Sequence, residues 1–198
     1  MATPKLHLRS AALLLLILLT ACFRLLNTEA THSPLINFTP VGAMALFSGC
    51  YLQSRWQAYY LPLIALWFSD VLLNRLFYFD TWVLFYSGFA WVYGSFLLMV
   101  LLGQAMRRVN VKNVVLGAVS AALIHWLVSD FGVWLGGGTD ITTGQPYPLD
   151  LAGLIKCYYL ALPFMRNMLL ANLLYWAMLF GGFEWLQHRY VALRPQAA

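Results

Sequence analysis

Six stretches of apolar residues, separated by short polar segments, run along the chain. A helix that crosses the hydrocarbon core of a bilayer needs about 20 predominantly apolar residues, and these stretches reach or approach that length. The pattern predicts an all-α, polytopic membrane protein: a six-transmembrane-helix bundle that forms one domain over residues 1–198. The predicted spans cover residues 10–26, 38–53, 57–77, 81–104, 113–135 and 158–186.

Two of these spans depart from a simple apolar helix. Pro40, Gly42 and Gly49 make the second span short and irregular. The last span is long and contains Pro163, which removes a helical hydrogen bond and tends to kink or break a helix. We therefore expect Pro163 to divide a preceding helical arm from the span proper.

The composition supports lipid as the main solvent. Hydrophobic residues make up 62% of the chain and charged residues only 10%, against about 25% charged residues in a typical soluble domain. The net charge of +5 could indicate nucleic acid, but the Lys and Arg residues are scattered around the apolar stretches. That placement indicates membrane orientation, and we expect the lipid bilayer and no nucleic acid as a partner.

The positions of the basic residues predict the orientation of the spans. The segments 27–37 and 136–148, which would be outer loops, contain no Lys or Arg. Positive residues favour the cytoplasmic side, so both termini are expected in the cytoplasm. Eight of the 12 basic residues then lie inside: Lys5, Arg9, Arg55, Arg107, Arg108, Lys112, Arg189 and Arg194.

The first span allows a second interpretation. The segment Leu19–Cys22 reads LTAC and follows a basic and then an apolar stretch, which is the form of a bacterial lipoprotein signal. Cleavage before Cys22 would leave five spans. An ordinary first span is favoured, because it alone keeps both basic termini on one side of the membrane.

Polar side chains follow one face of the third span. Asp70, Asn74 and Tyr78 stand at i, i+4 and i+8, and Asp80 closes the turn that follows. A charge at the centre of a bilayer costs about 2.5–3.5 kcal/mol on insertion scales, so such residues usually mark function. We interpret this stripe as part of a solute site.

Further charged residues are expected at the same depth. Leu63-Ile64 before Ser69-Asp70 is echoed by Leu123-Ile124 before Ser129-Asp130, through either duplication or chance. The sixth segment adds Lys156 and Arg166 at this depth. Together with Asp70 and Asp130, these residues predict an aromatic-walled cavity open to the outside. The alternative is an ion-pair network, with Asp70 or Asp130 neutralised by Arg166 or Lys156, that only locks the helices. The candidate substrate-binding residues are Asp70, Asn74, Tyr78, Asp80, Tyr86, Asp130, Lys156 and Arg166.

Motifs of several enzyme classes are absent from the sequence. The sequence contains no GxxxxGK[ST] for ATP hydrolysis by a P-loop, no HExxH and no GxSxG. We predict no catalytic residue of these classes, and ligand-exchange chemistry on a bound metal cofactor is the one enzymatic alternative.

Four segments carry a family resemblance. The residues NFTPVGAMALFSG, SDVLL, SDFGVWL and YPLDLAGLIKCYYLALPFMRN resemble the substrate-binding S-components of energy-coupling-factor vitamin transporters, in particular the solitary, BtuM-like cobalamin transporters. The resemblance implies six helices in the bacterial cytoplasmic (inner) membrane and a vitamin, such as cobalamin, in an outward-facing cavity. It also implies uptake either with a separate ATPase module or without one.

The resemblance further implies a metal ligand for the corrinoid. BtuM-like proteins can use a cysteine thiolate to bind cobalt, and Cys22 and Cys157 stand at a suitable depth. His32, in the first outer loop, is the alternative nitrogen ligand.

The sequence therefore leads to three alternative hypotheses for the function. The first is import of a vitamin-like solute. The second is a non-transporting accessory or assembly subunit that binds partners through small-residue faces such as Ala45/Gly49 and Gly117/Ala121. The third is a corrinoid-modifying membrane protein.

Overall fold

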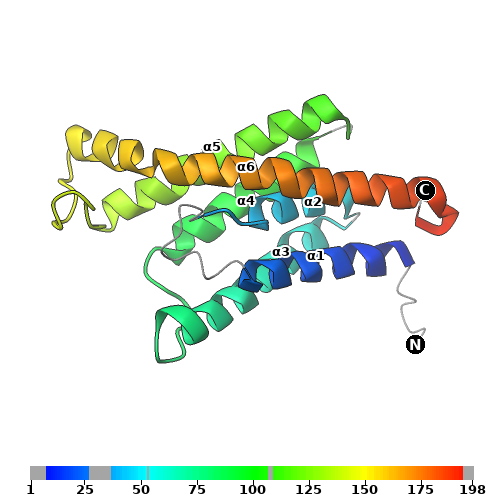
Figure 1. Cartoon of the computed structure of the whole chain (residues 1–198), viewed down its shortest axis with the longest axis horizontal. Helices are drawn as coiled ribbons and strands as arrows, with labels where there is room; N and C mark the ends of the chain where they lie inside the picture. The colour runs from blue at the N-terminus through cyan, green and yellow to red at the C-terminus, as the bar shows by residue number, and fades with distance from the viewer. Residues whose placement is uncertain (1–7, 27–36, 53, 107–108, 194–198) are drawn as a thin grey trace.

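The fold was taken from a computed structural model, which describes residues 8–26, 37–52, 54–106 and 109–193 (Figure 1). Over these residues the chain forms helices and no β-strand, apart from one isolated bridge between Thr139 and Pro146. The prediction of an all-α protein is confirmed for this part. The helices are α1 (Leu8–Leu26), α2 (Val41–Tyr51), α3 (Arg55–Leu73), the π-helical turn η2 (Asn74–Tyr78), α4 (Phe89–Ala105), α5 (Val111–Leu135), α6 (Leu151–Arg189) and the 3-10 turn η3 (Val191–Leu193).

Three helical segments are long and apolar enough to cross a membrane. They are Arg55–Tyr78, Val111–Leu135 and Leu151–Arg189, with 24, 25 and 39 residues. The other apolar helices in the described part of the chain are shorter: Ala11–Arg24 within α1, α2 and α4. Length and composition thus support a helical membrane protein with three such helices.

The short helix α2 lies inside the bundle. Ten of its 11 residues are buried, and it contacts α1, α3, α4, α5 and α6. A helix that is apolar on all sides lies either in a protein core or in lipid, and α2 lies in the protein core. Pro40, Gly42 and Gly49 predicted a short and irregular span here. The structure has a short central helix that begins directly after Pro40.

Glycine allows α2 and α4 to approach closely. A Cβ atom on Gly49 would collide with the carbonyl oxygen of Val100 and lie 3.0 Å from the Cα atom of Gly103. A Cβ atom on Gly103 would collide in turn with the carbonyl oxygen of Leu46. The two backbones therefore touch, as small residues permit in helical membrane proteins.

The predictions for the fourth and the sixth span were wrong in part. The fourth span was expected to begin at Thr81, but α4 begins at Phe89, after Gly88 with a φ of 83°. A left-handed residue ends regular geometry, and the apolar residues before it form an irregular segment. Pro163 does not divide the last helix, because α6 continues through it from Leu151 to Arg189.

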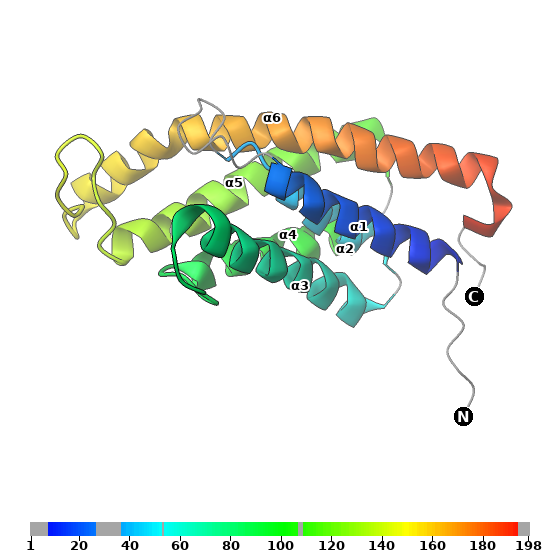
Figure 2. The same cartoon turned by 60° about the horizontal axis from the view of Figure 1, so that its bottom comes forward.

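The helices are arranged lengthwise, with the start of the first helix, α1, and the end of the last long helix, α6, at the same end of the molecule (Figures 1 and 2). The starts of α3 and α5 lie there too. Helix α1 packs against α2 and α3, whereas α5 packs mainly against α6. The connection between α5 and α6 lies at the opposite end, which also carries η2 and the irregular segment 79–88.

Candidate functional site

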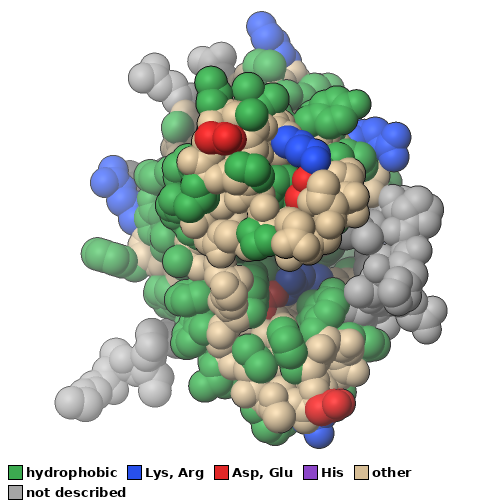
Figure 3. Space-filling view, turned by 90° about the vertical axis from the view of Figure 1, so that its left-hand side faces the viewer, with side chains coloured by type: hydrophobic (Ala, Val, Ile, Leu, Met, Phe, Trp, Pro, Cys, Tyr) green, Lys and Arg blue, Asp and Glu red, His purple; other side chains and the backbone are tan. Residues whose placement is uncertain are grey.

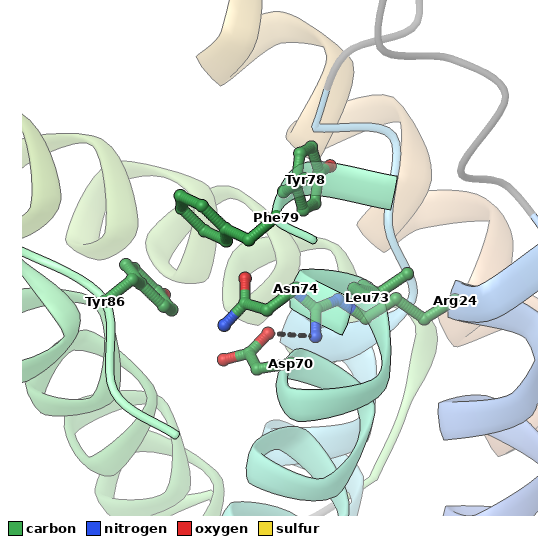
Figure 4. A pocket seen from close by; sticks show the side chains of 7 residues that line it. All are labelled: Arg24, Asp70, Leu73, Asn74, Tyr78, Phe79 and Tyr86. Carbon is green, nitrogen blue, oxygen red and sulfur yellow. Dashed lines mark hydrogen bonds and ion pairs between the residues drawn. The ribbon is translucent and has the colours of Figure 1, made fainter. Parts of the chain in front are cut away.

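A cavity of about 370 Å³ opens at the end of the molecule opposite the start of α1 and the end of α6. Figure 3 looks onto this end and shows a hollow with basic and acidic side chains at its floor. Seven residues from α1, α3, η2 and the segment 79–88 line the cavity (Figure 4). They are Arg24, Asp70, Leu73, Asn74, Tyr78, Phe79 and Tyr86.

An ion pair between α1 and α3 forms one side of the cavity. The Nη1 group of Arg24 donates hydrogen bonds to Oδ1 of Asp70 and to Oγ of Ser69, the latter at 2.7 Å. The hydroxyl of Tyr93 on α4 donates to Oδ2 of Asp70 at 2.8 Å. Asp70 is only 3% exposed, so these two donors compensate a carboxylate that is removed from water.

The π-helical turn η2 shapes the second side. The amide of Phe79 donates to the carbonyl oxygen of Asn74 at 2.7 Å, which closes the wide turn. The side-chain Nδ2 of Asn74 donates to the carbonyl oxygen of Val83 at 3.0 Å and ties the irregular segment to the end of α3. π-Helical turns often occur at functional sites. Figure 4 shows Tyr86, from the segment that Asn74 ties down, to the side of Asn74 and Asp70.

Three aromatic rings line the cavity above the polar floor. Figure 4 shows Tyr78, Phe79 and Tyr86 arranged around the side chain of Asn74. Tyr78 and Phe79 are about half exposed, at 50% and 47%. The cavity thus combines hydrogen-bonding groups with flat apolar surfaces, which is the usual composition of a small-molecule site.

Four of the eight predicted substrate-binding residues meet in this cavity: Asp70, Asn74, Tyr78 and Tyr86. The other four lie outside its lining. Asp80 and Arg166 are exposed, and Asp130 is half-buried on α5. Lys156 points to the connection between α5 and α6 instead.

The ion-pair partners named in the alternative interpretation were wrong for Asp70. That interpretation paired Asp70 or Asp130 with Arg166 or Lys156, but the partner of Asp70 is Arg24. Lys156 pairs with Asp140, a residue that the sequence interpretation had not considered. Arg24 could have been found, because a charged residue in an apolar span is itself a sign of function.

Asp140 organises the connection between α5 and α6. One of its oxygens accepts hydrogen bonds from the amide and hydroxyl of Thr142, at 2.8 and 2.7 Å, and the other pairs with Lys156. The hydrogen bond from Lys156 holds the pKa of the Asp140 carboxyl well below its ordinary value of 3.8. The carboxylate therefore stabilises the loop above pH 4, and this contribution is lost as the pH falls through the lowered pKa.

We expect Asp140→Asn to loosen this loop without disturbing the cavity. Amide hydrogen exchange of residues 138–147 should become faster by roughly tenfold, the size expected for loss of a charge-assisted hydrogen bond. Acidification should produce the same change progressively below pH 4 in the unmodified protein, after correction for the intrinsic pH dependence of exchange, and completely only below the lowered pKa. Asp80→Asn, in the exposed turn after η2, is the control. Unchanged exchange in Asp140→Asn would show that the ion pair does not hold the loop.

The predicted cobalt ligands do not line this cavity. Cys22 is exposed on α1 and lines a separate apolar groove between α1 and α3. Cys157 is buried, with its sulfur 3.5 Å from the carbonyl oxygen of Asp130. His32 lies outside the described residues. Among the described residues no group of three or more His, Cys, Asp or Glu side chains could hold a metal ion.

Comparison with known proteins places the chain in one family. The chain belongs to a family of unknown function (DUF6580), which matches residues 4–196. No curated protein and no solved structure matches the chain.

Proposed function

We propose that this family member is a membrane transporter that binds a vitamin-like solute in an outward-facing cavity. The observation that carries the proposal is the cavity itself, in which a buried ion pair, an amide and three aromatic rings meet at one end of an apolar helical bundle. Such convergence of polar groups in a mostly apolar pocket is the usual sign of a binding site. The resemblance to S-components supports the same proposal independently.

We propose six spans in the bacterial cytoplasmic membrane, with both termini in the cytoplasm. The start of α1 and the end of α6 lie at the same end of the molecule, as an even number of crossings requires. Arg55, Lys112 and Arg189 stand at the helix ends on that side, which agrees with the positive-inside rule. Helix α2 alone would span only about 16 Å, but its buried position means that other helices, and not lipid, surround it.

The volume of the cavity bears on the solute. Ligand pockets commonly measure about 300–1,000 Å³, so 370 Å³ suits a compact molecule. A complete corrinoid is larger than this cavity, and neither Cys22 nor Cys157 lines it. The volume therefore favours a vitamin smaller than cobalamin. Cobalamin is still tested first, because of the resemblance.

The accessory-subunit alternative receives less support. Gly49 packs against the backbone of α4, and a Cβ atom on Gly117 would collide with the ring of Trp176 on α6. The small residues that could have served a partner are used inside the bundle. The sequence has no P-loop, so uptake driven by ATP through a P-loop would use a separate ATPase module.

The proposal is tested by solute binding to the detergent-purified protein. Equilibrium dialysis against a panel of vitamins, including cobalamin with detection by absorbance, should find at least one solute bound near one per chain. Tyr86→Ala and Asn74→Leu should weaken that binding by about tenfold or more, because they remove a ring and the tie of the segment 79–88.

Tyr190→Ala, an exposed aromatic position outside the cavity, is the matched control and should bind as the unmodified protein does. A folded protein that binds no member of the panel would contradict the proposed function. Binding that Tyr190→Ala weakens as much as Tyr86→Ala would place the site elsewhere.

A further inference from the structure

We infer that the solute carries an oxyanion, a carboxylate or a phosphate, which Arg24 binds while the aromatic rings hold a planar part of the molecule. This inference rests on the proposed function and adds the chemical class of the solute. It follows from how the hydrogen-bonding groups of the cavity are already used.

Within the described part of the chain, the guanidinium of Arg24 has N–H groups that no residue accepts from. Its Nη1 group serves both Ser69 and Asp70. A guanidinium carries five N–H groups in a fork that fits a carboxylate or phosphate through two parallel hydrogen bonds. No described residue accepts a hydrogen bond from Nη2 or Nε, and the side chain is 22% exposed and lines the cavity. A second anion can therefore bind Arg24 without breaking the existing pair.

Asp70, the acidic partner of Arg24, exposes almost no surface to the cavity. The side chain of Asp70 is 4% exposed, and its two oxygens accept from Arg24 and Tyr93 respectively. A cationic solute would have to bury its charge against a carboxylate that is covered and already hydrogen-bonded on both oxygens. The arrangement thus favours an anion over a cation.

The remaining lining favours a flat molecule next to that anion. One of the two N–H groups of Asn74 is taken by the carbonyl oxygen of Val83, so its side chain offers a carbonyl acceptor and one remaining donor. Tyr78, Phe79 and Tyr86 present ring surfaces around it. A small aromatic or heterocyclic acid would satisfy both parts of the cavity, with its anionic group at Arg24 and its ring among these side chains.

Matched acid and amide pairs test this inference directly. The probes are nicotinate with nicotinamide, benzoate with benzamide, and a wider set of aromatic acids paired with their amides, titrated against the full chain in phosphatidylcholine nanodiscs. Acids should bind at least tenfold more tightly than their amides. Arg24→Gln should abolish the difference, and Arg24→Lys should reduce it, because an ammonium cannot form the paired hydrogen bonds.

Asp70→Asn provides a test that does not depend on loss of binding. Removing the competing carboxylate should tighten acid binding by about threefold to tenfold while leaving the amides unchanged, since only anions gain from the freed charge. This gain distinguishes anion recognition from a general loss of folding in the Arg24 variants.

Each contrary outcome has a separate meaning. If amides bind as well as acids, or if the vitamin panel yields only neutral or cationic solutes, the anion inference falls while the proposed function stands. If neither the acids nor the vitamin panel bind, both fall. An anionic lipid could also supply the oxyanion. Stabilisation by phosphatidylglycerol in the nanodiscs, without any response to soluble acids, would assign the site to lipid and overturn the inference.

Discussion

Replacement of Arg24 by Leu is expected to lower the free energy of unfolding by about 3–5 kcal/mol, the cost of leaving one buried partner of an ion pair alone. The stranded group would be Asp70, whose side chain is 4% exposed and would keep only Tyr93 as a donor. Asp70→Leu should cost less, because the Arg24 side chain is 22% exposed and remains open to the cavity.

The double variant Arg24→Leu/Asp70→Leu separates the ion pair from simple packing. Replacing a buried pair by apolar residues is often neutral, so the double variant should recover most of the stability lost by Arg24→Leu. Denaturant unfolding in detergent measures the cycle. Arg75→Leu, an exposed arginine stacked on Trp82 at the same end, is the control and should change stability by about 0.5 kcal/mol or less. Equal effects of Arg24→Leu and the control would show that the pair does not hold α1 to α3.

Gly103→Ala is expected to have the second large effect. The added methyl group would meet the carbonyl oxygen of Leu46, which is backbone and cannot rotate away. Overpacking of this kind costs about 1–3 kcal/mol, against a gain of up to about 1 kcal/mol from the better helix propensity of Ala. We therefore expect a net loss of stability, seen as a lower midpoint of thermal unfolding.

Gly94 supplies the matched control for this change. It stands on the same helix α4, and a Cβ atom there would meet no atom within 4 Å. Gly94→Ala should keep or slightly raise the unfolding midpoint, because only the propensity gain applies. If both variants behave alike, α2 and α4 do not cross as closely as the structure shows.

The helices could largely be predicted from the apolar pattern, and the reasons for the misses are local. The segment 81–88 is rich in aromatic residues and so resembles a span, but Gly88 adopts a left-handed conformation and α4 starts after it. Pro163 was expected to interrupt α6, yet the long helix accommodates it. Hydropathy measures solvent preference, and it does not report where the backbone leaves helical geometry.

The candidate site could be predicted where its residues share one helix. Asp70, Asn74 and Tyr78 line one cavity because helical spacing fixes their common face. The partner of Asp70 could not be identified, because pairing between helices depends on their packing. The sequence suggested Lys156 or Arg166, whereas the packing of α1 on α3 brings Arg24 into contact.

The most direct test of the central claim, a solute cavity that opens to the outside, is thiol labelling at Phe79. Phe79→Cys would be made after Cys22, Cys50 and Cys157 are replaced by Ser. Val111→Cys, at the 81% exposed start of α5, serves as the marker for the opposite side. We predict that a membrane-impermeant maleimide labels position 79 in intact cells, and position 111 only in inverted vesicles. Labelling of position 79 only in inverted vesicles would contradict the account.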